Sequence, residues 1–198
     1  MARPLRIFQV IEASGNSQVP GSQVWYRNLY EPLLDLGHDV VLFRAEEGRR
    51  ARARNDEQLR TQFSERLFET LRAEHAKAPF DLFFAYLIEG MIDPEVIRRI
   101  SQLGIPTCNF SCNNVHQFHL VSSFARYFDY SLHSELDVGS RFKEVGATPI
   151  CWPMAANPTY FRPSGRRQLQ TRSRGCRRPW RRCSGPGTSC RRQGGRSQ

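Results

Sequence analysis

Short apolar runs alternate along this chain with segments in which apolar residues recur every three or four positions. The apolar runs have the length of β-strands and span residues 5–12, 39–43, 81–87, 105–112, 130–133 and 148–154. The periodic segments have the spacing of amphipathic helices and span residues 23–36, 57–76, 93–103, 117–128 and 134–145. Strands that are apolar on both faces and separated by helices indicate a parallel sheet covered on both sides. We therefore expect an α/β fold, a doubly wound, Rossmann-like parallel sheet of about six strands.

Residues with special backbone preferences mark where several of these helices begin and end. Three glycines follow the last apolar residue of a helix, where a positive φ is common: Gly37, Gly104 and Gly146. Asp93 and Pro94 suit the N-cap and the first helical position. Ser134 and Asp137 form a weak capping box at the start of the last helix.

Residues 46–56 break the pattern because charge dominates them. They contain four arginines, and acidic residues flank these. We interpret the segment as a solvated connecting loop rather than as a basic binding patch, since the acids offset the positive charge.

The positive charge of the chain is concentrated in its last 35 residues. Residues 164–198 hold 11 of the 29 Lys and Arg residues and no acid, so residues 1–163 carry 18 basic against 19 acidic side chains. We expect a single domain over residues 1–163, followed by a disordered Arg/Gly-rich tail that lacks the apolar side chains of a core. The net charge of +10 therefore does not make the body a nucleic-acid binder. The tail could bind nucleic acid nonspecifically through its arginines.

No targeting segment or membrane-spanning run is visible in the sequence. Arg6 and Gln9 interrupt the apolar run near the N-terminus, and no other run approaches the length of a membrane span. We therefore expect a cytoplasmic protein. Cys108, Cys112 and Cys151 lie in apolar segments, where a free cysteine usually acts as a small buried hydrophobe.

The loop after the first strand is a candidate binding site because ligands of open α/β sheets bind beyond the carboxyl ends of the strands. Its backbone N–H groups could face an anion at the start of the following helix. The candidate residues are Gly15, Asn16, Ser17, Gly21 and Ser22. The loop has neither a G-x-G-x-x-G motif nor the spacing and lysine of a P-loop, so a nicotinamide cofactor is not expected. An ordinary connecting turn is the alternative.

Polar residues after the later strands are the other candidates. His116 follows the fourth strand and could orient a substrate hydroxyl or act as a general base. Asn113 and Asn114 beside it could hold sugar hydroxyls, although either could simply cap the next helix. Glu89, after the third strand, is a second candidate base or else a solvated loop residue. Ser134, after the fifth strand, is a further candidate for substrate contact. His116 and His119 have no carboxylate or cysteine partner in their segment, so a metal site is not expected.

Several segments together resemble the N-terminal half of a two-domain, GT-B-type glycosyltransferase. Residues 33–40, LLDLGHDV, are similar to the helix-to-strand junction of that family, and Gly104-Ile-Pro106 is similar to the entry to its fourth strand. Residues 155–163, AANPTYFRP, resemble the segment in which its first domain gives way to the second. The branch that the chain resembles most is the spore-maturation-type glycosyltransferases, which share a strand and loop like residues 110–116.

The resemblance implies transfer of a sugar from a nucleotide-sugar donor to an acceptor. In this family the N-terminal domain mainly holds the acceptor and supplies any general base, and the C-terminal domain mainly holds the donor. The resemblance places Gly15, Asn16 and Ser17 at the cleft, with His116 or Glu89 as base or orienting group. It implies no tightly bound cofactor, because the nucleotide sugar is a co-substrate.

The resemblance ends at Pro163, where the donor-binding domain should begin. Because glycosyl transfer needs both substrates held together, we expect the chain to be inactive alone. The density of Arg, Gly, Pro, Ser and Cys in residues 164–198 is typical of a GC-rich gene read out of frame. A truncated or frameshifted glycosyltransferase is therefore the first hypothesis. A non-catalytic nucleotide- or carbohydrate-binding module is the second.

Overall fold

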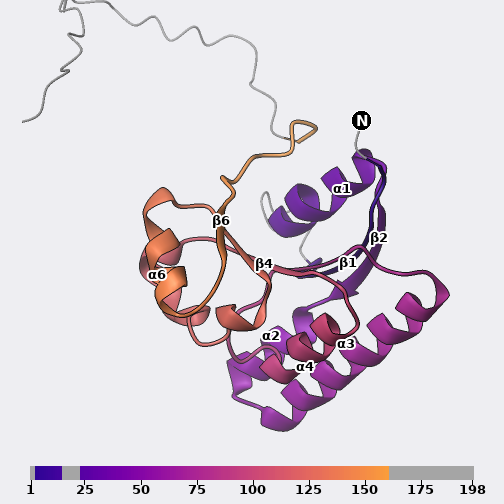
Figure 1. Ribbon diagram of the computed structural model, residues 1–198, viewed down its shortest axis with the longest axis horizontal. Helices are drawn as coiled ribbons and strands as arrows, with labels where there is room; N and C mark the ends of the chain where they lie inside the picture. The colour runs from indigo at the N-terminus through magenta and orange to yellow at the C-terminus, as the bar shows by residue number, and fades with distance from the viewer. Residues whose placement is uncertain (1–2, 15–22, 161–198) are drawn as a thin grey trace, which may run out of the picture. The chain divides into compact units, whose positions relative to one another are not determined.

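The computed structural model describes residues 3–14 and 23–160, which contain a six-stranded parallel sheet (Figure 1). Its strands are β1 (Arg6–Ile11), β2 (Asp39–Arg44), β3 (Leu82–Ala85), β4 (Thr107–Ser111), β5 (Tyr130–His133) and β6 (Pro149–Cys151). They lie in the order β2-β1-β3-β4-β5-β6, and every neighbouring pair is parallel. The expected fold class is confirmed. The predicted tail, residues 164–198, lies outside the described residues.

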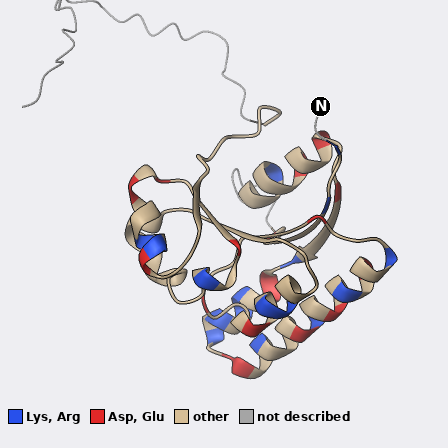
Figure 2. Cartoon of the chain, viewed as in Figure 1, with Lys and Arg blue, Asp and Glu red and all other residues tan. Residues whose placement is uncertain are grey.

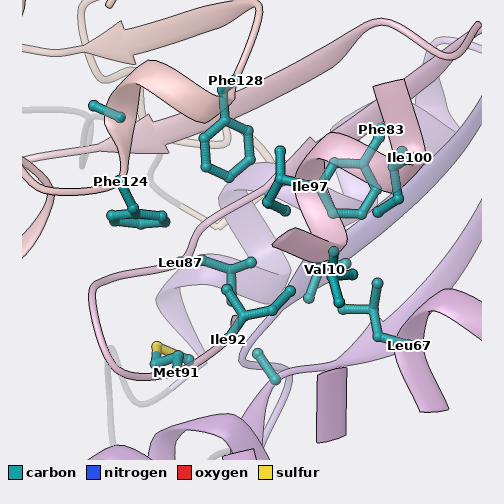
Figure 3. Packing of buried hydrophobic residues seen from close by; sticks show 14 of the residues in the cluster. Val10, Leu67, Phe83, Leu87, Met91, Ile92, Ile97, Ile100, Phe124 and Phe128 are labelled. Atoms are coloured by element: carbon teal, nitrogen blue, oxygen red, sulfur yellow. The ribbon is translucent and has the colours of Figure 1, made fainter. Parts of the chain in front are cut away.

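One face of the sheet carries the larger apolar core. It is covered by α2 (Glu46–Arg54), α3 (Glu57–Lys77), α4 (Pro94–Gln102) and α6 (Gly139–Glu144). The helices bury the residues that their periodicity predicts, such as Phe63 and Leu67 of α3 and Ile97 of α4. Figure 3 shows part of this cluster, where Leu87 and Ile92 lie close to Val10 of β1.

The opposite face is covered by a single helical segment and by the end of the described chain. The helix after β1 begins with a π-helical stretch, η1 (Tyr26–Tyr30), and continues as α1 (Glu31–Asp35). Pro32, which lacks an N–H donor, lies in the first turn of α1, just after the change from π to α hydrogen bonding. The segment after β6 lies against the same face, where Trp152 packs edge-on against Phe110 with ring centroids 5.2 Å apart.

Asn157 connects the segment after β6 to the helix after β1 through hydrogen bonds. Its side chain is buried, and its amide nitrogen donates to the Arg27 carbonyl at 2.7 Å. The backbone N–H of Asn157 donates to Asn28 Oδ1 at 2.7 Å, and the Tyr160 hydroxyl donates to Glu31 at 3.0 Å. The beginning and the end of the described chain therefore meet on this face.

Two predicted elements were wrong. Residues 46–56 are largely the helix α2 rather than a loop. Acids occupy its first turn and arginines its last, which complements the helix dipole. Asn55 follows its last residue with φ 50°, in the left-handed region that is common where helices end.

Residues 117–128 do not form one helix. They fold as the end of α5 (Asn114–Gln117) followed by the short 3₁₀ turns η2 (Phe118–Leu120) and η3 (Ala125–Tyr127). Aromatic, β-branched and serine residues in this stretch are weak helix formers. The four apolar residues expected to face the core are nevertheless buried: Phe118, Val121, Phe124 and Phe128.

The last helix also begins later than predicted. A 3₁₀ turn, η4 (Leu136–Val138), precedes α6, and Ser134 makes no capping bond there. The three glycines predicted to end helices do have positive φ, between 78° and 82°.

Candidate functional site

β1 and β3 are neighbours in the sheet, but the chain continues from them in opposite directions, to β2 on one side and to β4 on the other. The helix after β1 lies on one face of the sheet, whereas α4, which follows β3, lies on the other (Figure 1). Adjacent strands whose connections leave in opposite directions open a crevice at their carboxyl ends, and ligands of open α/β sheets bind there. A cavity of about 380 Å³ lies at this point. Its lining consists of Glu12, Trp25, Arg49, Arg52, Tyr86, Ile88, Met91, Gln117 and Leu120.

Two aromatic side chains form one wall of this cavity. Trp25, at the start of the helix after β1, and Tyr86, directly after β3, have ring centroids 4.2 Å apart with an interplanar angle of 31°. Burial, followed by the hydrogen bond between the Tyr86 hydroxyl and Cys112 Sγ at 3.5 Å, raises the pKa of Tyr86 well above its usual value. The tyrosine is therefore a neutral phenol at physiological pH, and the wall it forms with Trp25 is uncharged.

Charged side chains from α2 also line the cavity. Arg49 makes an ion pair with Glu12, the residue that follows β1. Arg52, one turn along the same helix face, donates from Nε to the Glu89 carbonyl at 2.9 Å. The cavity thus combines hydrogen-bonding groups with an aromatic surface, which is the usual make-up of a small-ligand site.

Glu46, at the start of α2, is hydrogen-bonded to the backbone at the start of the loop after β1. Its Oε1 accepts hydrogen bonds from the backbone N–H groups of Ala13 at 3.1 Å and Ser14 at 2.6 Å. This contact explains why α2 forms against the carboxyl edge of the sheet. The candidate residues further along that loop, Gly15, Asn16, Ser17, Gly21 and Ser22, lie outside the described residues.

A second polar cluster gathers around Glu135, at the carboxyl ends of β4 and β5. Glu135 accepts hydrogen bonds from the Asn113 backbone N–H, from Asn114 Nδ2 at 3.1 Å and from Ser134 Oγ at 2.8 Å. The structure therefore brings together three of the residues predicted to contact a substrate. Asn114 is buried and its Nδ2 also donates to the Ser111 carbonyl at 3.1 Å, so its amide hydrogens are already engaged within the protein.

The hydrogen bonds to Glu135 have a consequence for acid stability. Burial opposes ionisation of its carboxyl, but the hydrogen bonds from Ser134, Asn114 and Asn113 outweigh it and lower the pKa of Glu135 below its usual range. A carboxyl with a lowered pKa in the folded state stabilises the fold above its unfolded pKa, and this contribution is lost as the pH falls through the folded pKa.

We therefore expect Glu135→Gln to flatten the loss of stability between about pH 5 and pH 3, as measured by urea unfolding across this range. The effect should stay below about 1 kcal/mol because the group is only partly buried. Glu144→Gln, at an exposed position without a described hydrogen bond, is the matched control. An equal effect of both variants would contradict a special role of the Glu135 hydrogen bonds.

His116 and Glu89 make no described contact with each other. His116 is exposed on α5, directly before Gln117, which lines the cavity. Glu89 is exposed and lines a separate cavity of about 660 Å³ together with Arg60 and Asp93. These two residues therefore do not form a single catalytic group in this arrangement.

Sequence reasoning missed most of the cavity lining. Glu12 and Tyr86 directly follow β1 and β3, so the rule on strand ends could have found them. Arg49 and Arg52 lie three residues apart, a spacing that is informative only once residues 46–54 are known to be helical. Trp25 was expected only as a core residue of its helix.

Within residues 3–14 and 23–160, no three His, Cys, Asp or Glu side chains are grouped so that they could hold a metal ion. Of the helices in this same part of the chain, none combines the length and the apolar character needed to cross a membrane.

Comparison of the chain with family models, with curated proteins and with solved structures gave no match.

Proposed function

We propose that residues 1–163 are the acceptor-side half of a GT-B-type glycosyltransferase, which binds a sugar or another glycosyl acceptor at the carboxyl edge of its sheet. The observation that carries this proposal is the cavity between the ends of β1 and β3. It combines the Trp25 and Tyr86 rings with the charged groups of Glu12, Arg49 and Arg52. A pyranose ring has apolar C–H faces and a rim of hydroxyls, so a cavity that combines an aromatic wall with hydrogen-bonding side chains suits it.

His116 is the better of the two proposed bases. It directly precedes Gln117, which lines this cavity, whereas Glu89 itself lines the neighbouring cavity. A general base must come within hydrogen-bond reach of the acceptor hydroxyl, directly or through one water. In the proposed reaction His116 would take the proton of that hydroxyl, while a nucleotide sugar held by a second domain would supply the sugar.

Because the chain resembles only the acceptor half of such an enzyme, it should bind without turning over. We expect no sugar transfer when the full chain is incubated with nucleotide-sugar donors and simple sugar acceptors. Binding of D-glucose should still shift the Trp25 indole N–H resonance in nuclear magnetic resonance spectra. Trp25→Leu should weaken that binding about tenfold, because it removes the aromatic surface while preserving apolar contact with Phe110. Isothermal titration calorimetry measures this variant, since it lacks the reporter indole.

Trp152→Phe is the matched control, because Trp152 packs on Phe84 and Phe110 and does not line the cavity. Sugar transfer by this chain would contradict its proposed inactivity. Absence of any sugar binding would contradict the proposed function itself.

A non-catalytic nucleotide-binding module is the second candidate. The arginines of α2 favour it, since they could contact phosphates while a base stacks on Trp25. Binding of uridine diphosphate without any binding of sugars, in the same titration, would favour this candidate. Nonspecific nucleic-acid binding through residues 164–198 is a separate proposal, and deletion of those residues should abolish it.

A further inference from the structure

Arg52 stands out among the charged residues of α2 because it lines both cavities at the carboxyl edge. Figure 2 shows basic and acidic residues interspersed along α2 and α3, and several of these charges are paired. Arg49 pairs with Glu12, and Arg66 of α3 pairs with Glu47. Arg52 makes no ion pair within the part of the chain that the structure describes.

The side chain of Arg52 is nevertheless held in place. Its Nε donates to the Glu89 carbonyl at 2.9 Å. Its stem packs against Gly90, where an added Cβ would lie 3.3 Å from Arg52 Cγ. These contacts leave both terminal guanidinium nitrogens without a hydrogen-bond partner among residues 3–14 and 23–160. A guanidinium fixed in this way presents a planar pair of donors that matches the two oxygens of a carboxylate or a phosphate.

The net charge of the cavity lining also favours an anionic ligand. Among the described residues, its lining contains two arginines and one carboxylate, Glu12, and so carries one net positive charge. A neutral sugar would leave that charge without a partner, whereas an anionic group on the ligand would supply one. The volume of about 380 Å³ lies in the range of small-molecule sites, roughly 300–1,000 Å³.

We propose that this cavity binds an acidic sugar, a hexose carrying a carboxylate or a phosphate group. Its anionic group is bound by the terminal nitrogens of Arg52, and its ring lies against Trp25 and Tyr86. The inference rests on the proposed function in taking the ligand as a sugar, and it adds the charge of that sugar.

Titration of the full chain with D-glucuronate, D-glucose 6-phosphate and D-glucose tests this proposal, with the Trp25 indole N–H as reporter. The indole of Trp152 lines no part of this cavity and serves as an internal reference. At least one of the acidic sugars should bind about tenfold or more tightly than glucose, because it gains charge-assisted hydrogen bonds. The tighter of the two shows whether the carboxylate or the phosphate is the preferred group. Its advantage should shrink as salt is added.

Three variants separate the role of Arg52 from a general effect of charge. Arg52→Gln should abolish the preference for the acidic sugar. Arg52→Lys, which keeps the charge but lacks the planar pair of donors, should retain only part of it. Arg50→Gln makes the same change of charge on the same helix at an exposed residue outside the cavity, so it should leave the preference intact. Unchanged thermal unfolding of each variant would show that the fold is preserved.

The outcomes distinguish this inference from the proposed function. Equal binding of all three sugars, or a preference that survives Arg52→Gln, would overturn the acidic-sugar inference and leave the sugar site standing. Binding of inorganic phosphate with none of the sugars, or no binding at all, would overturn both.

Discussion

Replacing Phe63 with alanine should lower the free energy of unfolding by about 3–5 kcal/mol. Phe63 is completely buried in α3 and belongs to the main apolar cluster of the sheet. Its ring lies 5.6 Å from that of Phe43 of β2, between ring centroids, and next to Gly48 of α2. The substitution would remove most of the side chain and leave a cavity where α2, α3 and β2 meet.

Urea unfolding measures this effect, and the midpoint should fall while the denaturant dependence stays unchanged. Gln62→Ala, at the exposed position before it on the same helix, is the control and should cost less than about 0.5 kcal/mol. A loss below about 1 kcal/mol for Phe63→Ala would contradict the packing described for α2 and α3.

Replacing Gly48 with alanine should destabilise the protein by about 1–3 kcal/mol. At an exposed helical site the same change would stabilise by up to about 1 kcal/mol, because alanine is the better helix former. Here an added Cβ would lie 2.8 Å from the Met91 carbonyl oxygen and 2.8 Å from the Phe63 ring. The helix must therefore move away from the loop after β3 and from α3, and it carries Arg49 and Arg52 with it, so ligand binding in the cavity should weaken as well.

Thermal unfolding of Gly48→Ala alongside Gly139→Ala tests this prediction. Gly139 is the first residue of α6, and an added Cβ there would make only an ordinary contact with His133 Nε2 at 3.6 Å. The control should be neutral or slightly stabilising. If Gly48→Ala also raises the melting temperature, the close approach of α2 to the loop after β3 is refuted.

The sheet was predictable because its signals are local. Six apolar runs and the helical periods between them give the strands and most of the helices, and parallel pairing follows from their alternation. The prediction failed for residues 46–56, where charge concealed a helix. Two features that stabilise α2 were not visible in a search for apolar periods, namely the match of its end charges to the helix dipole and the contact of Gly48 with Phe63.

The candidate site was predictable only in part, for a different reason. The rule on carboxyl ends selected the edge of the sheet at which the cavity lies, and it brought Asn113, Asn114 and Ser134 into the prediction. It did not reveal that Glu135 engages all three, because hydrogen bonds between separate loops leave no pattern along the chain. The arginines of the cavity were overlooked because the segment that carries them was taken for a loop.

Asn157 also has a consequence for the order in which the molecule assembles. Its partners, Arg27 and Asn28, lie 130 and 129 positions earlier in the chain, respectively. The helix after β1 leaves the ribosome among the first elements, yet these bonds cannot form until residue 157 has been synthesised. Contacts between such distant residues carry a large loop-closure cost before they contribute stability. The first helix to be made is therefore among the last to complete its packing, and during synthesis its outer surface stays open to chaperones.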